Sequence, residues 1–93
     1  MHYLITGGAG FIGSNYAYRL LGRGERVTIY DNLSRRGTTA NLTWLRETYG
    51  PHAFTLIQGD VRDACLLTAA IRDADVVVHL ASQVAVTTSV LNP

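Results

Sequence analysis

A glycine-rich turn near the amino terminus constrains the fold of this chain more than any other feature. Gly7, Gly10 and Gly13 form a G-x-x-G-x-x-G pattern between a predicted strand at residues 2–6 and a predicted helix at residues 11–22. In such a turn the first glycine permits the tight bend, the second lets a diphosphate approach the backbone, and the third lets the helix pack closely. The N–H groups of Phe11 and Ile12 would then bind the anion. Glycine-rich turns also occur for purely structural reasons, but this context favours nucleotide binding.

The rest of the chain continues the alternation of strand and helix. Apolar runs that end in turn residues predict strands at residues 26–31, 53–58 and 75–80. Helical spacing predicts helices at residues 40–49 and after Asp63, which is expected to cap its helix. The pattern therefore predicts an α/β fold of the Rossmann type, a parallel sheet with helices on both faces and strand order 3-2-1-4.

A complete sheet of this type has about six strands. Residues 1–93 are therefore expected to be the N-terminal part of a dinucleotide-binding domain, truncated to about four strands. A fourth strand at the edge would leave unpaired backbone groups, which a partner chain could cover in a homo-oligomer.

Asp31 indicates which dinucleotide the chain would hold. It ends the second predicted strand, 18 positions after Gly13, near the offset of the acid that binds the adenosine ribose hydroxyls. A carboxylate there repels a 2′-phosphate, which favours NAD over NADP. Arg35 and Arg36 follow closely and could instead pair with that phosphate, so NADP remains open.

Two further segments leave predicted strands at the same edge of the sheet. Asp60 could accept a hydrogen bond from the adenine amino group, with Val61 covering the ring, although a turn and N-cap acid is the simpler alternative. The segment Leu80-Ala81-Ser82-Gln83 leaves the fourth predicted strand, and its small residues would leave room for the nicotinamide half.

Composition excludes several classes of function. The net charge of +1 provides no excess of basic residues for binding nucleic acid. No apolar run is as long as the about 20 residues that a helix needs to cross a bilayer. No Cys/His cluster has metal spacing. The single cysteine, Cys65, is expected in the core of a cytoplasmic protein, and His79 is expected to be buried and hydrogen-bonded rather than catalytic.

Four linked motifs carry a resemblance to a known family. Residues 6–14, 31–34, 59–63 and 79–81, in this order, resemble the amino-terminal half of the extended short-chain dehydrogenase/reductases, the NAD-dependent epimerases and dehydratases of sugar nucleotides. Residues 31–37 with 41–45, and residues 83–93, are similar to the CDP-paratose 2-epimerases of CDP-tyvelose synthesis. The resemblance covers the whole chain.

The resemblance implies a reaction and a set of cofactor residues. A hydride leaves a sugar carbon, C2 in the 2-epimerases, for tightly held NAD and returns to the opposite face of the sugar. The cofactor residues would be Gly7, Gly10, Phe11, Ile12, Gly13, Asp31, Asn32, Ser34, Arg35, Asp60, Val61, Leu80, Ala81 and Ser82. Val86, Thr87 and Thr88 match a segment that borders the substrate sugar in the family.

The family's general base is a tyrosine in a Tyr-x-x-x-Lys motif, and this chain contains no lysine. No catalytic residue is therefore assigned, the Tyr-Lys segment and the nucleotide-sugar substrate domain are expected to be absent from residues 1–93, and the chain alone is expected to be inactive. Two alternatives remain. One is another NDP-sugar 4-epimerase, 4,6-dehydratase or reductase, and the other is a non-catalytic NAD-binding regulatory module.

Overall fold

Four strands alternate with three helices in the computed structural model, which describes residues 1–80. The strands are β1 (His2–Thr6), β2 (Arg26–Asp31), β3 (Thr55–Gln58) and β4 (Val76–His79). The helices are α1 (Phe11–Gly22), α2 (Thr38–Tyr49) and α3 (Ala64–Arg72). The strands form one parallel sheet in the order β3-β2-β1-β4, which confirms the predicted fold class and strand order.

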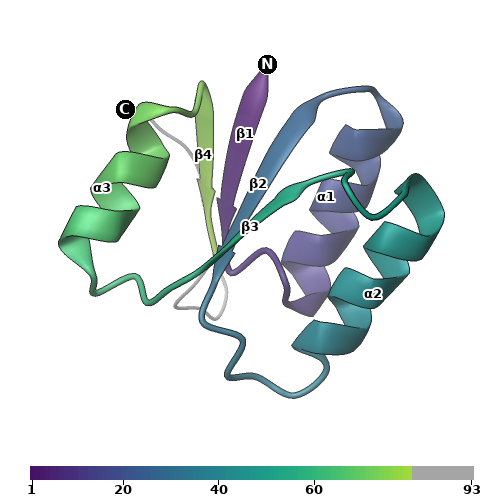
Figure 1. Ribbon diagram of the computed structural model, residues 1–93, viewed down its shortest axis with the longest axis horizontal. Helices are drawn as coiled ribbons and strands as arrows, with labels where there is room; N and C mark the ends of the chain where they lie inside the picture. Colours follow the sequence, from purple (N-terminus) through teal and green to yellow (C-terminus); the bar gives the residue numbers. More distant parts are fainter. Residues whose placement is uncertain (81–93) are drawn as a thin grey trace.

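The crossovers place α1 and α2 on one face of the sheet and α3 on the other (Figure 1). Successive strand residues point to opposite faces. Ile5 and Ile29 are therefore buried in the cluster that contains residues of α1 and α2, whereas Leu4 and Tyr30 are buried with Ala70 of α3. Because both faces of β1 and β2 are covered, these strands are apolar on both sides.

Aromatic side chains join α1 to α2. The rings of Tyr18 and Trp44 stack with centroids 5.0 Å apart and an interplanar angle of 13°. The Tyr49 hydroxyl donates a hydrogen bond to the carbonyl of Tyr18 at 2.9 Å. A Cβ at Gly22 would lie 2.9 Å from that hydroxyl, so the glycine makes room for it. These contacts pack α1 against α2.

The carboxyl ends of all four strands meet at one edge of the sheet (Figure 1). Thr6 pairs with Tyr30 on one side and His79 on the other, and Asp31 pairs with Gln58. The loops that follow the strands are therefore neighbours. The crossovers run outward from β1 to β3 and then return to β4, so β1 and β4 flank the switch point where open α/β sheets bind ligands.

Several local predictions were wrong. Strand β3 begins at Thr55 rather than residue 53, because the Ala53 N–H bonds to the Gly50 carbonyl in a turn at 3.2 Å, and β4 spans Val76–His79 rather than residues 75–80. Helix α2 begins at Thr38 rather than residue 40, because the Thr38 hydroxyl bonds to the carbonyl of Arg35 at 3.1 Å and the helix starts at this turn. Cys65 is exposed, since α3 packs its neighbouring leucines toward the sheet. His79 is also exposed, although its Nδ1 lies 2.6 Å from the Thr6 hydroxyl, as expected of a hydrogen-bonded histidine.

Candidate functional site

The glycines of the first loop differ in what a side chain at each position would meet. Gly7 has φ 75°, in the left-handed region that favours glycine. A Cβ on Gly13 would lie 2.5 Å from the Gly7 carbonyl oxygen and 2.6 Å from the Gly8 Cα, so only glycine lets α1 pack this closely. Gly10 has φ −73°, and among residues 1–80 a Cβ there would meet only the Gly7 oxygen, at 3.4 Å. The protein itself does not require a glycine at position 10, so the open space there is available to a ligand.

Helix α1 begins directly at this loop. Gly10 is its N-cap residue and supplies no side chain to the helix end, while its carbonyl accepts the N–H of Ser14 at 2.9 Å. The first N–H groups of an α-helix have no acceptor within the helix. Those of Phe11 and Ile12 are at a solvent-facing end, where the two residues are 78% and 66% exposed. Such a helix end attracts anions such as phosphates.

Asp31 connects the first loop, residues 7–10 after β1, to the second loop, residues 32–37 after β2. One carboxylate oxygen accepts the N–H of Ala9 at 3.0 Å, and the other accepts the N–H of Leu33 at 2.8 Å. The second bond closes an Asx turn that holds Leu33 at φ 61°, which a non-glycine residue rarely adopts. A carboxylate has about four acceptor positions. Each oxygen therefore retains an acceptor position for a further donor, such as a ribose hydroxyl.

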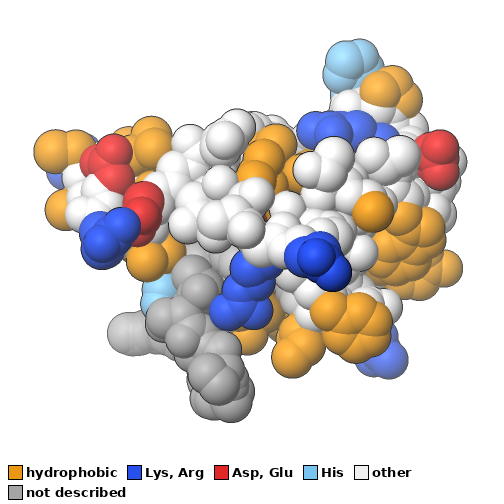
Figure 2. All heavy atoms as spheres, turned by 90° about the horizontal axis from the view of Figure 1, so that it is seen from below, with side chains coloured by type: hydrophobic (Ala, Val, Ile, Leu, Met, Phe, Trp, Pro, Cys, Tyr) orange, Lys and Arg blue, Asp and Glu red, His pale blue; other side chains and the backbone are white. Residues whose placement is uncertain are grey.

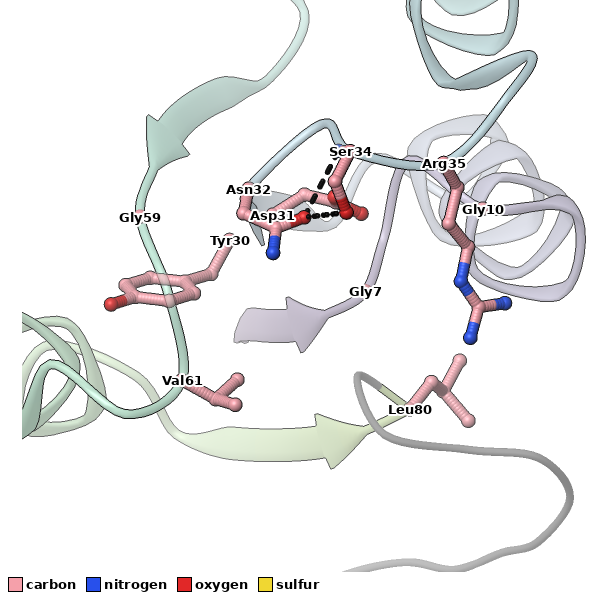
Figure 3. Close-up of a pocket in the computed structure, with 10 residues that line it drawn as sticks. All are labelled: Gly7, Gly10, Tyr30, Asp31, Asn32, Ser34, Arg35, Gly59, Val61 and Leu80. Atoms are coloured by element: carbon pink, nitrogen blue, oxygen red, sulfur yellow. Dashed lines mark hydrogen bonds between the residues drawn. The ribbon is translucent and has the colours of Figure 1, made fainter.

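The second loop continues with a similar turn. The Asn32 side-chain oxygen accepts two hydrogen bonds from Ser34, one from the backbone N–H at 3.0 Å and one from the side-chain hydroxyl at 2.8 Å (Figure 3). Arg35 extends from this turn along the Gly10 side of a cavity, across from Tyr30 and Val61. The turn therefore places hydroxyl, amide and guanidinium groups on one wall.

The third loop, residues 59–63 after β3, holds the Asp60 carboxylate in a fixed orientation. Asp60 accepts hydrogen bonds from the backbone N–H of Arg62 at 2.9 Å and from its guanidinium at 2.9 and 3.2 Å. These bonds lower the pKa of Asp60 from 3.8 to about 2, so the group is ionised at neutral pH. The prediction that Asp60 receives the adenine amino group stays a prediction. Asp63 then caps α3, as expected, by accepting the N–H of Leu66 at 3.1 Å.

A cavity of about 250 Å³ lies where these loops meet (Figure 3). It is lined by eight of the predicted cofactor residues, namely Gly7, Gly10, Asp31, Asn32, Ser34, Arg35, Val61 and Leu80. Four other predicted residues, Phe11, Ile12, Gly13 and Asp60, are not among its lining residues. The structure thus brings together residues from positions 7 to 80 in one cavity.

Two lining residues, Tyr30 and Gly59, were not predicted as part of the site. Tyr30 was assigned only to a strand, and Gly59 only to the turn that follows one. A glycine at a strand end often marks the close approach of another group. That signal could have identified Gly59, because a Cβ there would lie 2.8 Å from the Tyr30 hydroxyl.

The carboxyl edge of the sheet is seen from below in Figure 2. Arginine side chains lie near the middle of this face as well as toward its ends, whereas the acidic side chains lie only toward the two ends. One arginine, Arg35, lines the cavity. Positive charge beside the N-terminus of α1 suits an anionic ligand.

Some predictions fall outside the described residues. These concern Ala81 and Ser82 of the cofactor set and the three substrate residues Val86, Thr87 and Thr88. Within residues 1–80, no group of three or more His, Cys, Asp or Glu side chains is placed to hold a metal ion. In the same part of the chain, every helix is too short or too polar to cross a membrane.

Comparisons with known proteins agree with this geometry. The family model described as GDP-mannose 4,6 dehydratase matches residues 4–93. The whole chain is 45% identical to the CDP-paratose 2-epimerase of Salmonella typhi, of which it spans 27%. The chain therefore spans about a quarter of the length of that relative.

Solved structures show the same arrangement of elements. The UDP-glucose 4-epimerase of Stenotrophomonas maltophila, with bound NAD and formylated UDP-arabinopyranose, matches 91% of this chain and 25% of its own, with TM-score 0.79 and 31% identity. The dTDP-glucose 4,6-dehydratase of Bacillus anthracis, in complex with NAD, matches 89% of this chain and 27% of its own, with TM-score 0.73 and 29% identity.

Proposed function

This chain belongs to the GDP-mannose 4,6 dehydratase family, and on that premise we propose that it is the NAD-binding amino-terminal part of a sugar-nucleotide epimerase. The observation that carries the proposal is the cavity in which the glycine loop, the Asp31 turn and the third loop meet. Gly10 supports it most directly, because the space above that residue serves neither the backbone conformation nor the packing of the protein.

Each part of NAD would meet a group of suitable chemistry in this cavity. The diphosphate would lie over Gly10 and receive the N–H groups of Phe11 and Ile12. The adenosine ribose would donate to Asp31, and the adenine would lie beside Asp60 and Val61. The nicotinamide half would extend past Leu80 toward Ala81 and Ser82. Bound NAD supplies a hydride acceptor that later returns the hydride to the substrate.

Asp31 also carries the proposed choice of NAD over NADP. Its carboxylate would repel a 2′-phosphate, while its two occupied acceptor positions hold it rigidly between two loops. Calorimetric titration of the full gene product with NAD and NADP tests this role. We expect tighter binding of NAD, and we expect Asp31→Ala to weaken NAD and to relax the rejection of NADP. Unchanged selectivity in the variant would refute this role for Asp31. Tighter binding of NADP than of NAD by the unsubstituted protein would instead assign the choice of cofactor to Arg35 and Arg36.

The substrate proposal rests on the relatives. We propose a CDP-sugar that is epimerised at C2, because the relative with 45% identity is a CDP-paratose 2-epimerase. Val86, Thr87 and Thr88 are proposed to border the sugar. Incubation of the full gene product with CDP-paratose and analysis of the product by NMR tests this activity. Turnover of a UDP- or dTDP-sugar at C4 instead would assign a 4-epimerase or 4,6-dehydratase, the activities named for other relatives. Binding of NAD without turnover would favour a regulatory module.

A cytoplasmic location and a homo-oligomeric state belong to the same proposal. The single cysteine supports a reducing compartment. The position of β4 at one side of the described sheet supports pairing with a further strand or chain.

A further inference from the structure

Tyr30 is fully buried at the carboxyl end of β2 and forms part of the cavity wall. Its ring belongs to the cluster that contains Leu4 of β1 and Ala70 of α3. Its hydroxyl donates a hydrogen bond to the backbone carbonyl of Asp60 at 2.7 Å. Figure 3 shows the ring beside the segment that runs from Gly59 to Val61. A residue of the central sheet thus reaches the third loop of the site.

The backbone around Tyr30 contacts the other loops as well. The Tyr30 carbonyl accepts the N–H of Gly7 at 2.8 Å, at the start of the glycine loop. The carbonyl of the next residue, Asp31, accepts the N–H of Gly59 at 3.1 Å. The end of β2 is therefore bonded to the first and third loops, and the Tyr30 hydroxyl adds a side-chain bond to the third loop.

The fit between Tyr30 and the third loop is close. A Cβ on Gly59 would lie 2.8 Å from the Tyr30 hydroxyl oxygen and 2.6 Å from Cδ2 of Leu66, so a glycine is needed for the loop to reach the ring. Burial and the nearby carboxylates of Asp63 and Asp60 raise the pKa of the Tyr30 hydroxyl. The hydroxyl therefore stays protonated and remains a donor at neutral pH.

We propose that Tyr30 is a positioning residue for the adenine end of the cofactor, because its hydroxyl fixes the Asp60 carbonyl and with it the Asp60 and Val61 side chains. This inference rests on the proposed function, in which the cavity binds NAD. The bonds between Asp60 and Arg62 lie within the loop and orient one carboxylate. The Tyr30 bond instead ties the loop to the sheet, and so sets the distance between the adenine side and the ribose-binding Asp31.

Tyr30→Phe tests the proposal, because it keeps the buried ring and removes only the hydroxyl. Tyr49→Phe is the matched control, since the Tyr49 hydroxyl also donates to a backbone carbonyl, that of Tyr18, between α1 and α2. The dissociation constants of NAD and AMP are measured by calorimetry on the full gene product. AMP carries the adenosine end alone. We expect Tyr30→Phe to weaken both ligands by a similar factor, about three- to tenfold for one lost hydrogen bond, and Tyr49→Phe to weaken neither.

Gly59→Ala provides a second variant, which displaces the loop while the hydroxyl remains, and it should also weaken AMP. Unchanged AMP affinity in a folded Tyr30→Phe or Gly59→Ala protein would overturn the positioning role, as would a loss that affects NAD but not AMP. An equal loss of AMP affinity in Tyr49→Phe would show that the loss in Tyr30→Phe comes from lower overall stability, and it would also overturn the positioning role. Failure of the unsubstituted protein to bind either ligand would instead overturn the proposed function itself, and this inference with it.

Discussion

Two glycines in the same loop should respond differently to the same substitution. Gly10→Ala adds a Cβ that the protein accommodates, 3.4 Å from the Gly7 oxygen, but that lies where the diphosphate is proposed to pass. We expect nearly unchanged stability and NAD binding weaker by about tenfold, or ~1.4 kcal/mol. Gly13→Ala forces a Cβ to within 2.5 Å of that oxygen and should lower the free energy of unfolding by about 1–3 kcal/mol. Thermal unfolding and calorimetry separate the two effects. Normal NAD affinity in Gly10→Ala would show that the space is not the diphosphate site.

The pair of Asp60 and Arg62 predicts a dependence on pH. The guanidinium and backbone bonds of Arg62 hold the pKa of Asp60 at about 2, below its ordinary 3.8. Because the folded-state pKa is lower, the stabilisation is present above about pH 4 and is lost as the pH falls through about 2. Arg62→Gln should raise the pKa of Asp60 part of the way back, since the backbone bond remains. Carboxyl NMR titration measures this shift. The variant should be slightly less stable than the original at pH 7, and the two should become equally stable only below about pH 2. An unchanged titration midpoint would show that the guanidinium contributes nothing.

At the scale of elements, the sequence predicted well those features that depend only on residues close together in the chain, such as strand and helix bounds and a helix cap. β1, α1 and β2 have the predicted bounds, and Asp63 caps α3 as expected. The face that α3 buries was harder to predict. This helix is nine residues long, and its apolar side chains lie on several of its sides. Contacts with the sheet therefore decide which side of the helix is buried. Those contacts bury Ala70 and leave Cys65 exposed, although Leu66 and Leu67 suggested a core position for the cysteine.

The site could be predicted from sequence as far as it depends on residues at strand ends. Glycines after a strand and a carboxylate after the next strand are visible without coordinates, and the cavity includes Gly7, Gly10 and Asp31. The Tyr30 hydroxyl reaches a carbonyl 30 positions away, which depends on the pairing of β2 with β3. The bonds from Arg62 to Asp60 depend on the conformation of one turn. Neither contact follows from residue types or spacing alone.

The N-cap of α3 gives a prediction for a single element. The Asp63 carboxylate accepts the N–H of Leu66 at 3.1 Å, which satisfies one free donor at the helix start. Asp63→Ala should lower the free energy of unfolding by about 1 kcal/mol, the usual cost of losing such a cap. Glu47→Ala is a suitable control, because Glu47 is an exposed carboxylate within α2. Chemical denaturation of both variants measures the difference. Equal stability of the two variants would contradict a capping role for Asp63.

At the scale of the whole molecule, the cavity connects loops that follow all four strands, from Gly7 after β1 to Leu80 after β4. A ligand in it would contact residues from all four of these loops at once. The sequence separates these residues widely, and the parallel crossovers bring them together. Binding in this cavity should therefore stabilise the folded state as a whole rather than a single loop.

This coupling gives a prediction that requires no knowledge of the substrate. A ligand that binds only the folded state adds about 2.7 kcal/mol to the free energy of unfolding at 100 times its Kd. NAD should therefore raise the unfolding temperature of the full gene product, and NADP at equal concentration should raise it less because of Asp31. Gly10→Val serves as the control, since its side chain would occupy the space proposed for the diphosphate and abolish the shift. A shift of the same size in that variant would place NAD outside the cavity, and an equal shift with NADP would remove Asp31 as the selective group.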